Sequence, residues 1–254
     1  MSGRLSVIGL GPGDAAHVTP EASASIAEAT DLFGYGPYLD RLTLRADQHR
    51  HVSDNREELD RSRAALVAAA EGKTVAVVSG GDPGVFAMAA AVCEAIEHGP
   101  AEWRDIEIQV VPGVTAMLAV AARSGAPLGH DFCAISLSDN LKPWDVVKHR
   151  LKAAAGAGFV IALYNPISRA RPWQLGRAFE ALREMLPSTT PVIFGRAAFR
   201  QDEKIVINTL GEADPAQADM ATCIIVGSAE TRVIERGGRA PLVYSPRQSV
   251  GGSR

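Results

Sequence analysis

Six short runs of apolar and β-branched residues punctuate the chain, and each has the length of one β-strand. Most are solidly apolar rather than alternating, which indicates strands covered on both faces, as in a parallel sheet flanked by helices. Parallel strands need long crossover connections, and the intervening stretches carry helical patterns. We therefore expect an α/β protein with mainly parallel central sheets. The runs cover residues 5–8, 74–78, 106–111, 159–163, 191–194 and 223–226.

Helix signals fill the gaps between these runs. Thr19-Pro20-Glu21 supplies a capping hydroxyl, a proline at the first helical position and an acid at the positive end, so it predicts a helix as far as Ala29. The apolar segment 85–96 predicts a helix packed between layers.

The stretch 123–131 contains Ser-Gly and Pro-Leu-Gly, which predict an interdomain linker. We accordingly expect an N-terminal α/β domain over residues 1–122 and a C-terminal α/β domain over residues 132–246, with a cleft between them. The polar, glycine-rich residues 247–254 predict a frayed tail.

Composition narrows the class of partner. The 254 residues are 46% hydrophobic with a net charge of -3, so a folded core is expected and nucleic acid or an anionic membrane is disfavoured. Three widely spaced cysteines without CxxC pairing predict buried thiols in the cytoplasm. The histidines show one close pair, His49 and His51, expected in a solvated charged loop, and we predict no metal site.

The first strand ends in Gly9-Leu10-Gly11-Pro12-Gly13-Asp14, which is close to a dinucleotide-binding fingerprint. However, Asp14 replaces the third glycine, and Pro12 lacks the N–H that a phosphate would use. The loop therefore favours a ligand without phosphate, or else is a plain strand-to-helix turn.

The second loop, residues 79–84 with sequence SGGDPG, follows another strand. Glycines there let a ligand approach the backbone, and Asp82 can hold ribose hydroxyls or a cationic sulfonium. The alternative is Asp82 as a helix N-cap with Pro83 at the first helical position. Two further strand ends, 110–116 and 163–166, have similar turn residues, and four such ends can converge on one ligand.

These loops, in this order and with the later Asp219-Met220-Ala221-Thr222, resemble the tetrapyrrole methylase family over nearly the whole chain. The resemblance implies S-adenosylmethionine as methyl donor, S-adenosylhomocysteine as product, a tetrapyrrole substrate and a homodimer of two-domain subunits. Segments 34–39, 79–88, 136–139, 164–166, 171–175 and 195–196 resemble the members that methylate C17 of a corrin precursor and contract its ring. The related uroporphyrinogen-III methylases have an acid where Gly36 follows Tyr35, which argues against the sirohaem-type reaction.

Family cofactor contacts transfer onto ten positions of this sequence, with Ala197 placed to within one residue. They are Pro12, Gly80, Gly81, Asp82, Val85, Thr115, Ala116, Asn165, Ala197 and Thr222.

The carboxylates of a corrin precursor call for basic partners. Residues 139–204 hold eleven Lys or Arg against six acids, most of them expected on solvated helix faces. Four of these residues follow strand ends and are our candidates for binding acetate or propionate arms: Arg169, Arg171, Arg196 and Arg200.

Ring contraction would be assisted by removal of a hydroxyl proton, for which Asp139, His130 and Tyr35 are candidate general bases. Each has a structural alternative, respectively a turn cap, a linker residue and a strand aromatic. Other readings stay open: a cobalt-containing substrate, another corrin methylase, a relative acting on RNA or protein, a nucleotide-dependent oxidoreductase, or a silent binding module.

Overall fold

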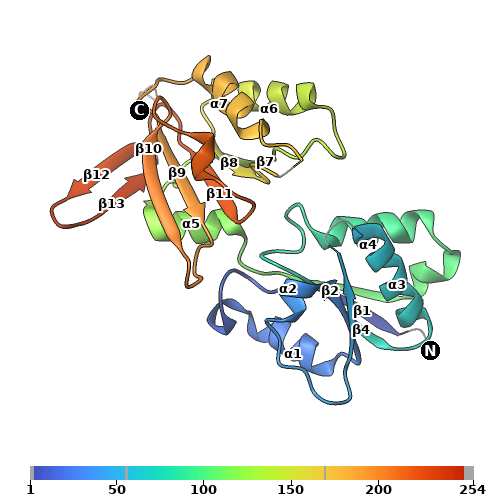
Figure 1. Cartoon of the computed structure of the whole chain (residues 1–254). Coiled ribbons are helices and arrows are strands. Elements are labelled where there is room, and N and C mark those ends of the chain that lie inside the picture. Colours follow the sequence, from blue (N-terminus) through green and yellow to red (C-terminus); the bar gives the residue numbers. More distant parts are fainter. Residues whose placement is uncertain (1–2, 55–56, 169, 249–254) are drawn as a thin grey trace. The chain divides into compact units, whose positions relative to one another are not determined.

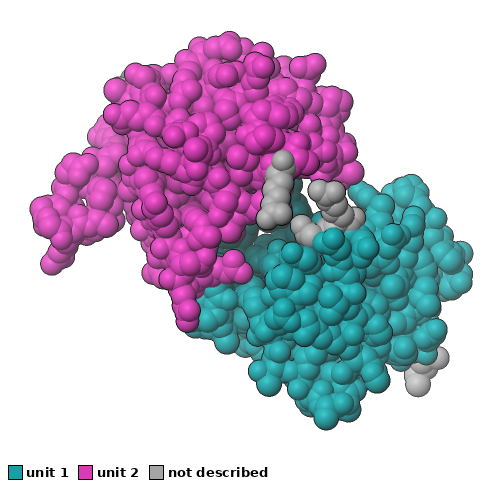
Figure 2. All heavy atoms as spheres, in the orientation of Figure 1, with its two compact units in different colours: residues 1–115 teal, residues 116–254 magenta. Residues whose placement is uncertain are grey.

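A computed structural model describes residues 3–54, 57–168 and 170–248. It divides into two compact units, Met1–Thr115 and Ala116–Arg254, here called unit 1 and unit 2 (Figure 2). The boundary precedes the expected linker, so helix α5 (Ala116–Ser124) and residues 123–131 belong to unit 2. The reason is packing, because the apolar face of α5 joins the core of the C-terminal sheet.

Unit 1 is built on a five-stranded sheet in the order β3-β2-β4-β1-β5, with every pair parallel as predicted. Its two faces bury different side chains: Leu5 and Val7 pack towards α3 and α4, whereas Ile8 and Leu32 pack on the side of α1 and α2 (Figure 1). The strands are β1 (Arg4–Gly9), β2 (Asp31–Tyr35), β3 (His49–Ser53), β4 (Thr74–Ser79) and β5 (Glu107–Val111).

The helices of unit 1 follow the capping signals closely at α1, where the Thr19 hydroxyl accepts from the N–H of Ala22 at 3.1 Å. His51 was wrongly expected in a solvated loop: it lies in β3, stacks on Phe33 and contacts the buried Asp31 at 2.8 Å. The helices are α1 (Pro20–Glu28), α2 (Gly36–Leu39), α3 (Glu58–Ala70) and α4 (Met88–His98), with 3-10 turns at Ala15–His17 and Ala101–Asp105.

Unit 2 contains a second sheet, in the order β10-β9-β11-β8-β7. Parallel pairing holds for β7 with β8, but the three remaining pairs are antiparallel. The short connection from β9 to β10 makes these two strands an antiparallel pair. β11 runs in the same direction as β10 on the other side of β9, so it is antiparallel to both of its neighbours, β9 and β8. The strands are β7 (Phe132–Ser136), β8 (Val160–Tyr164), β9 (Pro191–Arg196), β10 (Lys204–Thr209) and β11 (Thr222–Val226).

Helices α6 (Trp144–Gly156) and α7 (Gln174–Arg183) cover one face of this sheet, and α5 covers the other. A small sheet of β6 (Gly125–Ala126), β12 (Arg232–Arg236) and β13 (Arg239–Tyr244) completes unit 2, and its β12–β13 hairpin projects outward (Figure 1). Most of the expected frayed tail lies outside the described residues. In the described ranges no helix has the length and apolar character to cross a membrane.

Candidate active site

Three glycine-containing loops meet at the carboxyl edge of the unit 1 sheet. The loops after β1 and β4 are bridged through backbone hydrogen bonds between Gly11 and Gly81, at 3.0 and 3.3 Å. Both glycines have positive φ, +60° and +67°, which L side chains rarely adopt. Of the four strand ends expected to converge, the three of unit 1 therefore meet, whereas the fourth, residues 163–166, belongs to unit 2.

Asp82 ties the third loop to the second. One carboxylate oxygen accepts from the N–H of Gly84 at 2.8 Å, and the other accepts from the N–H of Gly113, after β5, at 3.0 Å. The N-cap alternative is wrong, because α4 begins only at Met88 and its N-cap position is Ala87. The carboxylate instead fixes the spacing of two loops with charge-assisted hydrogen bonds.

The glycines permit an approach that no side chain would allow. A Cβ at Gly113 would lie 2.3 Å from the Gly81 carbonyl oxygen, and one at Gly9 would lie 2.7 Å from the same atom. A Cβ at Gly80 would meet the ring of Tyr38 at 2.8 Å. This close-packed glycine backbone fits a ligand recognised through main-chain contacts, as the resemblance implies for S-adenosylmethionine.

The remaining predicted contacts of unit 1 border these loops. Pro12 is half-buried beside the bridge, and Thr115 is buried at the end of the β5 loop. Val85 lies before α4 rather than inside it, since residues 85–87 are not helical and Phe86 has φ +52°. Asp14 caps the 3-10 turn by accepting from the N–H of Ala16.

Unit 2 gathers its predicted contacts at one edge of its own sheet. β11 is antiparallel to β8 and β9, so its first residue, Thr222, lies at the edge where those strands end, opposite Arg196. Asn165 and Ala197 follow β8 and β9 and have φ near +50°, and the N–H of Ala197 donates to the Ala221 carbonyl. Ala116 is the first residue of α5, the helix that packs on the sheet face opposite to α6 and α7.

The Asn165 amide donates to the Ser136 hydroxyl at 2.9 Å, joining the ends of β8 and β7. The Thr222 hydroxyl donates to Asp219 at 2.8 Å. These side-chain bonds give both strand ends a fixed shape.

The basic candidates differ in their partners. Arg171 pairs with Asp139 at 2.8 Å. Arg196 pairs with Asp202 and Asp219, both at 2.7 Å, and these hydrogen bonds raise the pKa of Arg196. Arg200 is exposed. Arg169 lies outside the described residues.

The candidate bases are not brought together. Asp139 lies in the loop after β7, whereas His130 precedes β7 at the opposite end of that strand. Tyr35 ends β2 in unit 1, with its ring edge-on to Tyr38 at 5.5 Å. Among the described residues no cluster of three or more His, Cys, Asp or Glu has a metal-binding arrangement.

Sequence reasoning missed two residues of the unit 1 loops. Arg41 donates to the carbonyl of Leu10 at 2.9 Å and to that of Gly11 at 3.2 Å, which holds the first loop against α2 and the residues after it. The ring of Tyr38 packs closely against the backbone of Gly80. Their sequence spacing from the glycines gave no signal, because a contact between distant segments depends on the fold.

The chain matches the Tetrapyrrole (Corrin/Porphyrin) Methylases family over residues 4–214. It is 66% identical to a protein of Sinorhizobium sp named precorrin-3B C(17)-methyltransferase, with 100% of both chains covered. It is 40% identical to the probable cobalt-factor III C(17)-methyltransferase of Salmonella typhimurium, covering 90% of this chain and 94% of that one. A crystal structure of the methyltransferase CobJ aligns with TM-score 0.92 at 50% identity, covering 96% of this chain and 100% of that one. The family predicted from the loop motifs is confirmed, and the chain belongs to the tetrapyrrole methylases, enzymes that use S-adenosylmethionine.

Proposed function

We propose that the protein transfers a methyl group from S-adenosylmethionine to C17 of precorrin-3B, with contraction of the ring to precorrin-4, in aerobic cobalamin biosynthesis. The observation that carries this proposal is the full-length likeness to the Sinorhizobium enzyme of that name, joined to the bridged loops of unit 1. The Salmonella relative supports a second candidate, methylation of the cobalt-containing counterpart.

In this proposal the backbone of the two bridged loops, with Pro12, Asp82, Val85 and Thr115, holds the methyl donor on the side of unit 1. The close-packed glycines support this role, because they leave main-chain atoms rather than side chains at the strand ends. The residues proposed to hold it on unit 2 are Ala116, Asn165, Ala197 and Thr222.

The bound donor supplies a methyl group on a positively charged sulfur. What the protein adds is alignment and exclusion of water, which can lower the barrier without a strong base. Tyr35 is the candidate base for the proton removed during ring contraction, because its ring packs on Tyr38 beside the Gly80 loop. His130 has no role in this proposal, because it precedes β7, at the end of the strand opposite to the Asp139 loop.

We further propose a cytoplasmic homodimer. The outward β12–β13 hairpin supports the dimer, since Val233 and Ile234 are 37% and 46% exposed on it and a second copy would cover them. Cys223 is buried as expected, whereas Cys93 is exposed and Cys133 is half-buried. Their free thiols support a reducing compartment.

The test is incubation of the purified protein with S-adenosylmethionine and either precorrin-3B or its cobalt complex, followed by mass and absorbance spectra. A gain of one methyl group with the spectral change of ring contraction is expected for precorrin-3B. Methylation of the cobalt complex alone would favour the second candidate, and no methylation of either would refute the function.

A further inference from the structure

Two loops of unit 2 are joined by a single carboxylate. One oxygen of Asp139, in the loop after β7, contacts Nε of Arg171 at 2.8 Å and accepts from Nε2 of Gln174 at 2.9 Å. Gln174 is only 2% exposed at the start of α7, so the carboxylate is anchored to the body of the unit. The arrangement fixes the position of the arginine side chain.

Among the described residues, the side-chain partner of the Arg171 guanidinium is Asp139, which contacts Nε. Arginine has five N–H donors in a flat fork, and Asp139 contacts the Nε edge. Asp139 is the one carboxylate paired with Arg171 in the described ranges of the chain. The terminal nitrogens are therefore suited to a second carboxylate in a forked geometry.

A second cation lies in the same loop as Asp139. The Lys142 ammonium donates to the Ser138 carbonyl at 3.0 Å. Burial and the nearby positive charge of Arg150 lower the pKa of Lys142, and Asp139 only partly offsets them. Because Asp139 is already paired with Arg171, the positive charge here is under-compensated, which favours binding of an anion.

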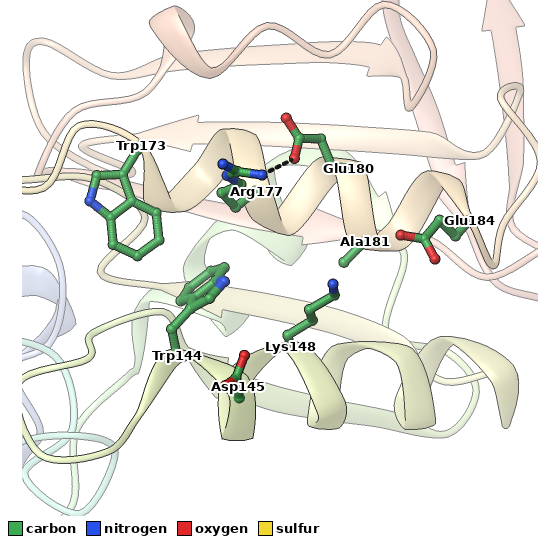
Figure 3. Close-up of a pocket in the computed structure, with 8 residues that line it drawn as sticks. All are labelled: Trp144, Asp145, Lys148, Trp173, Arg177, Glu180, Ala181 and Glu184. Carbon is green, nitrogen blue, oxygen red and sulfur yellow. Dashed lines mark hydrogen bonds and ion pairs between the residues drawn. The ribbon is translucent and has the colours of Figure 1, made fainter.

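Aromatic residues hold both loops where they enter their helices. Trp144 and Trp173 each stand two residues after one of the cations, and their indole rings meet edge-on at 5.0 Å. They lie at one end of a cavity of about 450 Å³ between α6 and α7, whose other end carries charged side chains (Figure 3). The contact holds the starts of α6 and α7 together, next to the loops that carry the two cations.

We propose that Lys142 and Arg171 bind one acetate or propionate carboxylate of the tetrapyrrole, and that Asp139 and Gln174 are positioning residues that orient Arg171 for it. This inference rests on the proposed function. In this arrangement Asp139 orients a substrate-binding arginine rather than acting as a base, and Lys142 joins the substrate-binding residues.

Steady-state kinetics of Arg171→Ala, Lys142→Gln and Asp139→Asn test the proposal, with Arg177→Gln as the matched control. Arg177 is also a cation, but it lies within α7, pairs with Glu180 and lines the cavity between α6 and α7 rather than belonging to the Asp139–Arg171 cluster (Figure 3). Loss of a charge-assisted contact should raise the KM for precorrin-3B about tenfold in the first two variants and severalfold in Asp139→Asn, with kcat nearly unchanged. Arg177→Gln should match wild type.

A double variant separates positioning from base catalysis. If Asp139 acts through Arg171, then Asp139→Asn adds nothing to the KM of Arg171→Ala. A large fall of kcat in Asp139→Asn, in either background, would overturn the positioning role. Unchanged KM in Arg171→Ala and Lys142→Gln would overturn the carboxylate site.

Binding of S-adenosylhomocysteine, measured by calorimetry on every variant, identifies loss of folding. A variant that loses this binding is replaced by Arg171→Gln or Lys142→Met, which also remove the positive charge and for which the same rise in KM is expected. Failure of the proposed function is distinct, because the wild-type protein would then methylate neither tetrapyrrole.

Discussion

Substitution of Gly113 by alanine should disrupt the loop cluster of unit 1. The added Cβ would lie 2.3 Å from the Gly81 carbonyl oxygen and 2.9 Å from the Gly9 carbonyl carbon, which are backbone atoms unable to rotate away. Overpacking typically costs about 1–3 kcal/mol. Displacement of Gly113 would also lengthen its 3.0 Å bond to Asp82, and a hydrogen bond to a charged group contributes about 1.5–3 kcal/mol. We expect unit 1 to lose about 3 kcal/mol of stability.

Two measurements check this expectation. Hydrogen exchange should accelerate at the amides of residues 9–11, 79–82 and 84, and the affinity for S-adenosylhomocysteine should fall at least about tenfold. Gly176→Ala is the matched control, because its Cβ would meet Pro215 at an ordinary 3.7 Å inside α7, where alanine stabilises a helix. Wild-type exchange and affinity in Gly113→Ala would refute the requirement for close backbone contact.

Three further outcomes follow from local contacts. Burial raises the pKa of Asp31, but hydrogen bonds, chiefly from His51, lower it by more, so the folded-state pKa lies below 3.8. The stability that Asp31 contributes is therefore present above pH 3.8 and is lost as the pH falls through the folded-state pKa. Asp31→Asn should consequently make the free energy of unfolding depend less on pH in the acid range. Burial raises the pKa of the Cys223 thiol to about 12, so a thiol reagent should modify the exposed Cys93 first and reach Cys223 only after unfolding; equal rates in the native protein would contradict this. Gly195→Ala would place a Cβ 2.1 Å from a side chain of α5 and should lower the melting temperature of unit 2, and an unchanged value would show that α5 can shift freely.

The strand pattern predicted β1, β4 and β5 of unit 1, which carry apolar, β-branched runs. It missed β2, which Gly34 interrupts, and β3, which is polar and largely exposed. The same pattern could not reveal the antiparallel pairs of unit 2. Apolar strands such as Cys223 to Val226 have the same composition in either direction, and the direction depends on the connection before them. Pro127 and Gly129 look like a linker in sequence, whereas Pro112 and Gly113, which lie just before the division between the two compact units, look like an ordinary strand end.

The site was predictable where glycine and proline restrict the backbone, as at Gly11, Gly81 and Pro12. It was less predictable where a side chain reaches a distant segment. Asp82 matches a helix cap in sequence, yet its carboxylate bonds to Gly113. Likewise, a base and an arginine were predicted separately at Asp139 and Arg171, and only the fold shows them paired.

The position of β11 has a consequence for synthesis of the chain. This strand lies between β8 and β9, so these two strands cannot join one sheet until β11, which ends at residue 226, has left the ribosome. Unit 1 is complete in sequence much earlier and can fold while the rest is being translated. During that interval β8 and β9 each present an unpaired apolar edge, which is the condition under which nascent chains aggregate. A stop codon near residue 214, where the family match ends, would leave those edges permanently open.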